Sequence, residues 1–439
     1  MTPCNLLSAW FVLLLTGAHA LAADWPQWRG PAGQGHSSAT NLPLQWGESQ
    51  NIAWKTSLPG RGWSSPVVDA THVWMTTAFE ELADPAESAR RLKDNTGNQP
   101  LTVLREVRLH ALAVDRKTGR IAHHIELLRQ REPQAVHKLN SYASPSPVLD
   151  SGRLFCHFGA YGTACVDTAT GKVLWRNQAL SVQHENGPGS TPVVWKDLLL
   201  FHMDGSDQQF VVALETATGK VRWRTARSGK LNENPQLKKS YGTPLVLDMA
   251  GQPVLISPGA DWVYGYDPAT GRELWKLGYG ELGFSISPRP VAGHGLFFMS
   301  TSFMRAQILA VRYEQTGAPH IAWSAKRGAP QMPSPILVGD ELYVITDAGG
   351  LVTCLDARTG REHWQERLGG NYSASPAFAE GRLYFHSREG MTHVVKPDKT
   401  GLRVLAKNPI EGQLMASMAI AGQSIFLRSD TALYCIQKP

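Results

Sequence analysis

The 439-residue chain has 43 Lys and Arg against 37 Asp and Glu, a formal net charge of +6. Its apolar content of 42% is ample for a core, and 41 Gly with 28 Pro suit a fold with many tight turns. Basic residues are scattered, with small clusters such as Arg90-Arg91 and Lys238-Lys239 and no Lys/Arg-rich tract, so the charge fits a role in solubility. Together with the export predicted below, this argues against a nucleic-acid partner.

The first 23 residues predict a signal peptide. They contain no Asp, Glu, Lys or Arg, and an apolar run over residues 6–15 precedes small residues at 18–23 (AHALAA). We expect cleavage near Ala22 or Ala23, no membrane span, and export to the periplasm or the extracellular space. Residues 24–50 form an N-terminal extension. Trp25 and Trp28 in it are expected to pack as a plug against the domain, because an exposed pair of Trp rings is costly.

The rest of the chain, residues 51–439, is built from a repeat. Four near-identical segments, each with a Thr-Gly step followed by Trp, occupy residues 165–175, 213–223, 265–275 and 354–364. Degenerate copies occupy residues 113–124, 310–323 and 395–405. The Gly of the Thr-Gly step falls at 119, 171, 219, 271, 317, 360 and 401, so the spacings are 52, 48, 52, 46, 43 and 41. Such a period is typical of a solenoid or propeller, in which each unit buries its apolar face against the next.

A second marker sets the number of units. A short strand that begins with Ser or Thr followed by Pro recurs six times, starting at Ser65, Ser146, Thr191, Thr243, Ser334 and Ser375. Arg289-Pro290 and Ser417-Met418 occupy the same place in the two other units. These make eight strand starts but only seven Thr-Gly turns. Residues 51–55 supply the missing strand, so the N-terminal strand completes the last sheet and leaves no open edge. We predict one all-β domain over residues 51–439: an eight-bladed β-propeller of four-stranded antiparallel blades.

Recurrent Trp and Cys residues are expected to be structural. The Trp rings should pack between neighbouring blades, and replacing such a buried ring with Ala should cost about 3–5 kcal/mol; the residues are Trp54, Trp175, Trp223, Trp275, Trp323 and Trp364. Cys165, Cys354 and Cys435 occupy a small buried site on the third strand of their units. Cys156 faces Cys165 across a hairpin if Ala160-Tyr161 is a two-residue loop, which would allow a disulfide; a loop one residue different removes that pairing.

The tandem LD-x-x-TG-x-x-x-W pattern resembles the pyrroloquinoline quinone (PQQ)-type repeat, found in quinoprotein dehydrogenases and in the non-catalytic propeller of the BamB outer-membrane assembly lipoprotein. More narrowly, residues 24–31 (DWPQWRGP), 186–192 and 369–376 resemble exported PQQ-like propellers of planctomycete-type bacteria. The resemblance implies eight blades and export, and it supplies no reaction.

Two enzymatic hypotheses follow from the resemblance and the fold. A quinoprotein dehydrogenase of alcohols or sugars needs PQQ, Ca²⁺ and an Asp base. The chain has neither the adjacent cysteines of the family's alcohol dehydrogenases nor a C-x-x-C-H haem motif, so we predict no cofactor and keep PQQ with Ca²⁺ as the alternative. A polysaccharide hydrolase or lyase needs two carboxylates near the axis. Glu233, Glu281 and Asp261 are conceivable, but nothing in the sequence connects them.

The favoured hypothesis is a non-catalytic, monomeric binding or scaffolding module with an envelope protein or polymer as its partner. Its site should lie on the face that carries the long polar loops of blades one to three, including a short charged helix near residues 85–93. We expect His184-Glu185 and Lys238-Lys239 to be solvated, and the segment from Asp204 to Asp207 to be an ordinary turn rather than a Ca²⁺ site. The candidate residues are His137, Asn140, Tyr142, His184, Glu185, Asn186, Asp204, Asp207, Asn232, Glu233, Asn234 and Tyr241.

Overall fold

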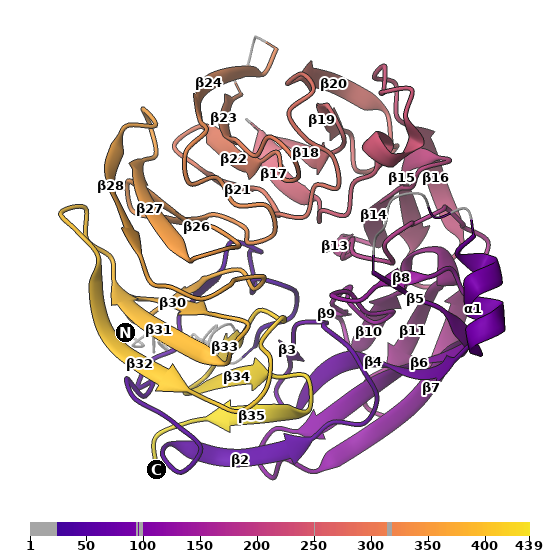
Figure 1. Ribbon diagram of the computed structural model, residues 1–439, viewed down its shortest axis with the longest axis horizontal. Helices are drawn as coiled ribbons and strands as arrows, with labels where there is room; N and C mark the ends of the chain where they lie inside the picture. Colours follow the sequence, from indigo (N-terminus) through magenta and orange to yellow (C-terminus); the bar gives the residue numbers. More distant parts are fainter. Residues whose placement is uncertain (1–23, 94, 96–99, 250, 314–317) are drawn as a thin grey trace, which may run out of the picture.

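The protein is an eight-bladed β-propeller (Figure 1), as the repeat predicts. The computed structural model describes residues 24–93, 95, 100–249, 251–313 and 318–439. The expected signal peptide, residues 1–23, lies outside these, as does the degenerate turn at Gly317. Within the described part of the chain, no helix combines the length and the apolar character needed to cross a bilayer.

Each blade is a four-stranded antiparallel sheet whose first strand lies nearest the axis. Blade 1 contains β3 (Val67–Val68), β4 (His72–Leu82), β6 (Leu104–Asp115) and β7 (Ile121–Arg131), and blade 2 contains β9 (Val148–Asp150), β10 (Arg153–His157), β11 (Thr163–Asp167) and β12 (Val173–Asn177). Blade 3 contains β13 (Val193–Trp195), β14 (Leu198–Asp204), β15 (Gln209–Glu215) and β16 (Val221–Ala226). Blade 4 contains β17 (Leu245–Met249), β18 (Gln252–Pro258), β19 (Trp262–Tyr266) and β20 (Glu273–Gly278). Blade 5 contains β21 (Val291–Gly293), β22 (Leu296–Ser300), β23 (Ile308–Arg312) and β24 (His320–Ala325). Blade 6 contains β25 (Ile336–Val338), β26 (Glu341–Ile345), β27 (Leu351–Asp356) and β28 (Glu362–Arg367). Blade 7 contains β29 (Ala377–Ala379), β30 (Arg382–His386), β31 (Met391–Lys396) and β32 (Arg403–Pro409).

Blade 8 is closed by the start of the domain. It contains β33 (Ala419–Ala421), β34 (Ser424–Arg428) and β35 (Ala432–Ile436), and its outermost strand is β2 (Ile52–Ser57). Trp54 lies opposite Cys435 and Lys55 opposite Tyr434 in this antiparallel pair. The predicted ring closure is therefore confirmed, and both ends of the propeller meet within one sheet.

The recurrent Trp rings join six of the eight blades to the next. In these units the Trp lies opposite a small third-strand residue, as in the pairs Cys165–Trp175, Ala213–Trp223 and Gly265–Trp275, while blade 1 has His123 at this place. In five of the six described units, the indole N–H donates to a backbone carbonyl in the next blade's turn; for Trp175 this is Thr216 O at 2.9 Å. Most of these rings are half-buried, and Trp364 is 9% exposed. The cost of about 3–5 kcal/mol expected for a fully buried ring is thus an upper bound here.

The Gly of the Thr-Gly turn lies directly under the neighbouring ring. Gly219 has φ of +71°, and a Cβ added there would lie 2.4 Å from the Trp175 ring. Gly119 meets Trp54, Gly271 meets Trp223, and Gly360 meets Trp323 in the same way. Glycine is required at these positions by both the left-handed backbone and the contact, which explains why the turn and the Trp recur together.

A second, inner set of contacts follows the Ser/Thr residues that start the first strands. Each backbone N–H donates to the side-chain hydroxyl at the same position of the next blade. Donor and acceptor pairs are Ser65–Ser146 (2.9 Å), Ser146–Thr191 (3.0 Å), Thr191–Thr243 (3.2 Å), Arg289–Ser334 (2.9 Å), Ser334–Ser375 (2.9 Å), Ser375–Ser417 (2.9 Å) and Ser417–Ser65 (3.0 Å). We call these eight positions the hydroxyl ring. Only the step from Thr243 to Arg289 lacks the bond among these described residues, because Arg289 carries no hydroxyl.

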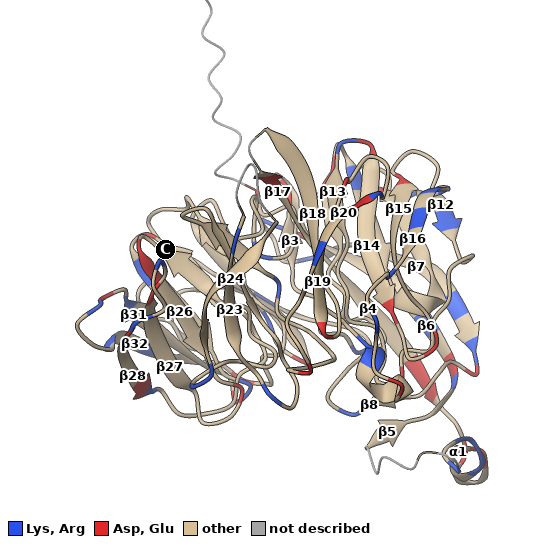
Figure 2. Ribbon diagram, turned by 90° about the horizontal axis from the view of Figure 1, so that it is seen from above, with Lys and Arg blue, Asp and Glu red and all other residues tan. Residues whose placement is uncertain are grey.

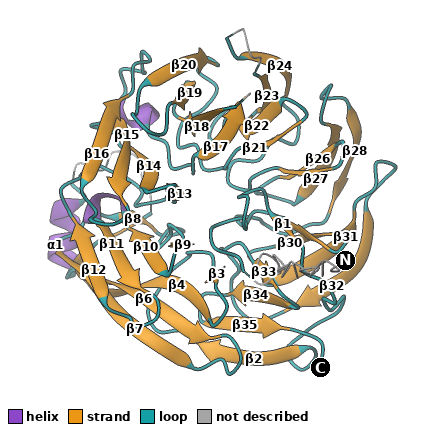
Figure 3. Ribbon diagram, turned by 180° about the vertical axis from the view of Figure 1, so that it is seen from behind, coloured by secondary structure: helices purple, strands orange, loops and turns teal. Residues whose placement is uncertain are grey.

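The N-terminal extension fills the channel behind the hydroxyl ring. Trp25 forms a bridge with Val68 and is 1% exposed, and β1 (His36–Ser37) adds a parallel strand to β29 on the inner side of blade 7 (Figure 3). Trp28 donates through its indole N–H to Ser417 Oγ at 3.2 Å. Arg289 donates to the Trp28 carbonyl at 2.8 Å. The expected plug is confirmed, and we use that name for residues 24–37.

The cysteine register excludes the disulfide in this structure. Phe155 lies opposite Cys165 and Cys156 opposite Ala164, so the two thiols point to opposite faces of the sheet, and both are free. The connection contains the short 3-10 turn η1 (Gly159–Tyr161), and it differs in length from the two-residue loop that would have aligned them. Cys165, Cys354 and Cys435 are buried as expected, and burial raises the pKa of Cys165 to about 12.

Blade 1 carries the largest insertion. Strands β4 and β6 extend well beyond the other blades, and between them lie α1 (Pro85–Arg91) and β5 (Leu101–Thr102), which pairs with β8 (Val136–His137). Helix α1 begins after Asp84, whose side chain accepts the Glu87 N–H. Figure 2 shows α1, β5 and β8 projecting from one face of the ring. This confirms the expected short charged helix and places it on the loop-rich face.

Removing one ring hydroxyl should destabilise the propeller. Ser146→Ala leaves the buried N–H of Ser65 without an acceptor, so we expect a loss of about 1–3 kcal/mol in the free energy of unfolding, measured by urea denaturation. Ser190→Ala is the matched control, because that buried hydroxyl has no partner among the described residues. Equal losses in the two variants would contradict a structural role for the ring.

The contact between Trp and Gly can be separated from backbone strain. Gly219 and Gly152 both have left-handed φ, +71° and +73°, but a Cβ at Gly152 meets nothing within 4 Å. Both Ala variants should lose about 1–2 kcal/mol for the backbone. Gly219→Ala should lose at least about 1 kcal/mol more, because the Trp175 ring must move. Indistinguishable melting temperatures for the Gly219→Ala and Gly152→Ala variants would contradict a packing contact between Gly219 and the Trp175 ring.

Candidate functional site

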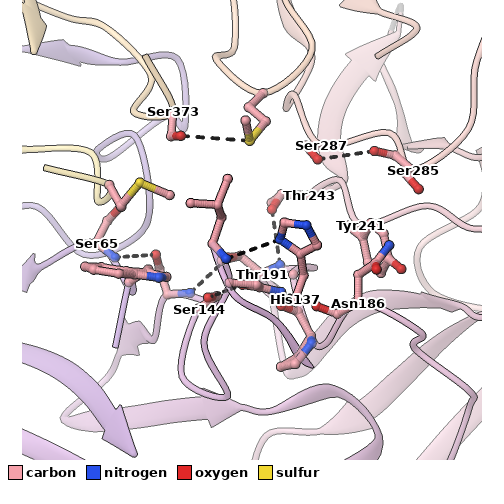
Figure 4. Close-up of a pocket in the computed structure, with 18 of the residues that line it drawn as sticks. Ser65, His137, Ser144, Asn186, Thr191, Tyr241, Thr243, Ser285, Ser287 and Ser373 are labelled. Carbon is pink, nitrogen blue, oxygen red and sulfur yellow. Dashed lines mark hydrogen bonds between the residues drawn. The ribbon is translucent and has the colours of Figure 1, made fainter. Parts of the chain in front are cut away.

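A cavity of about 490 Å³ lies on the propeller axis, above the hydroxyl ring and on the loop-rich face (Figure 4). Its lower level consists of ring hydroxyls, with the Trp28 ring of the plug among them; the hydroxyls are those of Ser65, Ser146, Thr191, Thr243 and Ser417. Its upper level comes from the loops that lead from each outermost strand into the next blade. The volume falls in the range of about 300–1,000 Å³ usual for small-ligand sites.

The repeat determines which residues form the upper level. In all eight blades the residue two positions before the hydroxyl-ring position lines the cavity: Trp63, Ser144, Gly189, Tyr241, Ser287, Met332, Ser373 and Met415. Loop residues such as Leu139, Phe284 and Phe303 complete the wall. The site is thus assembled from every blade, and no single loop contains it.

Four of the twelve candidate residues line this cavity: His137, Asn140, Asn186 and Tyr241. Asn140 braces the wall, because its amide donates to Asn186 O at 2.9 Å and Pro188 O at 3.2 Å. Tyr241 donates its hydroxyl to the His184 carbonyl. His137 accepts the Leu139 N–H on Nδ1 at 3.2 Å, and burial lowers its pKa.

Tyr142 and His184 lie behind the wall. The Tyr142 hydroxyl donates to Gln134 O at 2.6 Å. The expectation that His184 is solvated is wrong: the side chain is 5% exposed, and Nε2 accepts the Ala160 N–H at 3.1 Å. Burial lowers the pKa of His184 to about 4, so the ring is neutral and serves as an acceptor that fixes the loop.

The acidic candidates serve structural roles away from the cavity. The segment from Asp204 to Asp207 does connect β14 to β15, but the Asp204 carboxylate forms a buried ion pair with Arg227 at 2.8 Å. Asp207 lies at the surface and accepts the Gln183 N–H at 2.7 Å. Neither carboxylate is directed into the axial site.

Three of the remaining candidates belong to the loop between blades 3 and 4, and Glu185 belongs to the loop between blades 2 and 3. Asn232 Oδ1 accepts the Asn234 N–H at 2.9 Å, and Asn234 caps the short 3-10 helix η2 (Pro235–Lys238). Glu233 is exposed. Glu185 is half-buried and lies 3.9 Å from Lys239 Nζ, and the expectation that Lys239 is solvated is wrong, because it is fully buried. None of these side chains lines the cavity.

Charged groups are missing from the wall. Of the described residues that line the cavity, none is Asp, Glu, Lys or Arg. Elsewhere in the described chain, no three His, Cys, Asp or Glu side chains gather closely enough to hold a metal ion. Burial and the neighbouring Glu281 raise the pKa of Asp261 to about 6, but neither residue lines the cavity.

Sequence reasoning missed the apolar part of the site. Trp63, Phe284, Phe303, Met332 and Met415 line the cavity, and Phe303 is 46% exposed at its mouth. Next to it, Met304 is 72% exposed. The sequence did contain a signal for these residues, since Trp63, Met332 and Met415 each stand two positions before a Ser that starts the first strand of a blade. The prediction relied on polar loop residues instead of this periodic position.

Comparisons with known proteins agree on the architecture. A family model described as "Outer membrane protein assembly factor BamB" matches residues 44–186 and 162–438. No curated protein matches the sequence. Among solved structures, BamB from Moraxella catarrhalis aligns with a TM-score of 0.53 at 12% identity, over 76% of this chain and 99% of that one. A europium-containing methanol dehydrogenase aligns with a TM-score of 0.64 at 13% identity, over 94% and 90%. At these identities the structural likeness shows the fold alone.

Burial of His184 makes the free energy of unfolding depend on pH. The unfolded ring has a pKa near 6.5 and the folded ring near 4, so the unfolded chain binds an extra proton between these values. The contribution of His184 is complete above pH 6.5 and falls by about 1.4 kcal/mol for each pH unit down to about pH 4. His184→Gln keeps an acceptor for Ala160 and should flatten the decline in unfolding free energy measured by urea titration at pH 7, 6 and 5. An equal slope in His184→Gln and in a variant of exposed His320 would contradict this role.

Proposed function

The chain belongs to the family described as outer membrane protein assembly factor BamB, and we propose that it is an exported, non-catalytic binding module of the cell envelope whose ligand enters the axial cavity. The observation that carries the proposal is the composition of the cavity wall. Aromatic rings, thioethers and hydroxyls can bind a ligand, whereas no Asp, Glu, Lys or Arg lines the described wall to stabilise a developing charge. The single imidazole of the described wall, His137, is held by the Leu139 N–H on Nδ1 and has no charged partner there to form a catalytic pair.

The wall does not suit PQQ held by Ca²⁺, the alternative that the fold suggests. PQQ carries three carboxylates, which need cationic or numerous N–H partners, and Ca²⁺ takes carboxylate or carbonyl oxygens. The cavity offers no Arg, Lys, Asp or Glu among its described lining residues. Binding a polyanion there would bury charge without compensation.

The family description supports a place at the envelope, and the predicted signal peptide supports export. The loop-rich face supports a partner larger than the cavity itself. Phe303, Met304 and Leu139 are exposed apolar side chains at 46%, 72% and 50%, and Phe303 and Leu139 line the cavity mouth. Such groups on an otherwise polar loop face are typical of an interaction site.

Photo-crosslinking tests whether this face is the binding face. With benzoylphenylalanine in place of Phe303, we expect adducts in cells that express the full-length chain. The same group at exposed Lys172 lies in a Thr-Gly turn on the opposite face, and it should give none of those adducts. Equal or exclusive labelling from position 172 would place the site elsewhere and overturn the proposal.

The redox alternative has its own test. We expect no heat when the mature chain is titrated with PQQ, either in Ca²⁺ or in chelator, and no turnover of alcohols or sugars with an artificial electron acceptor. Tight binding that requires Ca²⁺ would replace the binding-module proposal with a quinoprotein dehydrogenase.

A further inference from the structure

The lower wall of the cavity is a row of neutral hydroxyls. Five ring hydroxyls line it, and each already accepts a backbone N–H from the preceding blade; they are Ser65, Ser146, Thr191, Thr243 and Ser417. Within the described part of the chain none of their O–H hydrogens has an acceptor. A hydroxyl that accepts one N–H keeps its own hydrogen and a second lone pair, so these groups can donate to a ligand and, except for Ser417, which also accepts from Trp28, can accept from it.

Three further polar atoms in the wall are buried without a partner among the described residues. Trp63 Nε1 is a donor, Asn186 Oδ1 is an acceptor, and Ser285 Oγ can be either. The Ser285 side chain is 8% exposed. Buried polar atoms are nearly always satisfied, so these three indicate groups that a ligand or water completes.

Apolar surfaces alternate with these polar atoms. The rings of Phe284 and Phe303 lie 6.1 Å apart with a tilt of 54°, and both line the cavity. The Trp28 ring contributes to the wall from the plug, and Met332 adds a flexible thioether. A ligand must therefore have apolar faces and a polar rim.

We propose that the cavity binds a neutral saccharide, as one end or an exposed segment of an envelope polymer. A pyranose has C–H faces that pack on aromatic rings, and its hydroxyls can both donate to and accept from the hydroxyls of the wall. One sugar hydroxyl can also donate to Asn186 Oδ1. A peptide fits less well, because each residue offers one fixed donor and one fixed acceptor, whereas nearly every carbon of a sugar ring carries a group that does both.

The absence of charge on the described wall selects against acidic polymers. A uronic acid or phosphate would enter a site with no cation at its lining and would lose hydration without compensation. A neutral sugar loses only its hydrogen bonds to water, and the hydroxyls of the cavity wall replace these bonds. The inference rests on the proposed binding function and names its ligand class.

Calorimetric titration of the full mature chain tests the ligand class with defined probes. The neutral probes are tetramers of β-1,4-glucose, α-1,4-glucose and β-1,4-N-acetylglucosamine, and the charged probe is the tetramer of β-1,4-glucuronic acid. We expect at least one neutral tetramer to bind and the glucuronic acid tetramer to bind at least tenfold more weakly. Equal or tighter binding of the charged tetramer would overturn the inference.

Paired variants locate the binding. Ser285→Ala and Trp63→Phe each remove one unpartnered polar group and should raise Kd about three- to tenfold. Ser190→Ala and Trp46→Phe are matched controls, because they remove buried, unpartnered groups that do not line the cavity, and they should leave Kd unchanged. Phe303→Ala, at an exposed position, should weaken binding without threatening the fold. Unchanged affinity in all three cavity variants would place the saccharide elsewhere.

The result also separates this inference from the proposed function. If no tetramer binds while position 303 still gives crosslinked adducts, the saccharide assignment fails and the binding module stands with a protein partner. If no tetramer binds and position 303 gives no adducts, both fail.

Discussion

The hydroxyl ring sets the dimensions of this propeller. At seven of the eight steps one blade donates a backbone N–H to a side chain of the next, so the inner strands are held at the distance of one hydrogen bond around the axis. A side chain longer than Ser or Thr cannot serve at that distance, and a shorter one cannot accept. The Trp rings make the corresponding contact at the outer edge, where those of Trp54, Trp175, Trp223 and Trp323 each pack over a glycine of the next turn. Two concentric sets of contacts therefore hold the blades, one polar and one largely apolar.

The proposed function draws on the same inner contacts. Five ring hydroxyls line the cavity, and the residue two positions before each ring position forms the next level of the wall. A structural bond repeated around the axis thus leaves a row of hydroxyls in the cavity. The proposed ligand would meet groups that closure of the ring already places there, with a different upper-level residue in each blade, such as Trp63, Tyr241 and Met332.

The sequence predicts what is local or periodic. The Thr-Gly step, the Trp and the Ser/Thr-Pro start each sit at a fixed offset, so blade number and ring closure can be read without coordinates. The disulfide between Cys156 and Cys165 could not be decided in this way, because one residue in a hairpin loop reverses the face on which a side chain points. Burial of His184 and Lys239 was equally hidden, since it depends on loops from neighbouring blades that close over them. The cavity was missed because it gathers one residue from every blade, and polar loop residues drew the prediction outward to the rim.

The single irregular position in the hydroxyl ring is where the extension enters. Arg289 replaces a hydroxyl that would accept the Thr243 N–H, because a guanidinium has no acceptor. Its guanidinium donates to the Trp28 carbonyl and to Gln27 Oε1. The extension then touches inner strands of several blades: Trp25 bridges β3, the Pro26 carbonyl accepts the Leu149 N–H of β9, and Gly35 accepts the Phe378 N–H. These contacts span the axis, so the missing ring bond is offset by a segment that holds opposite blades together. The same segment brings the Trp28 indole to Ser417 and makes it part of the cavity wall. Because the extension closes the channel from behind, the loop-rich face is the route into the cavity, and under the proposed function the extension contributes to the ligand site as well as to the fold.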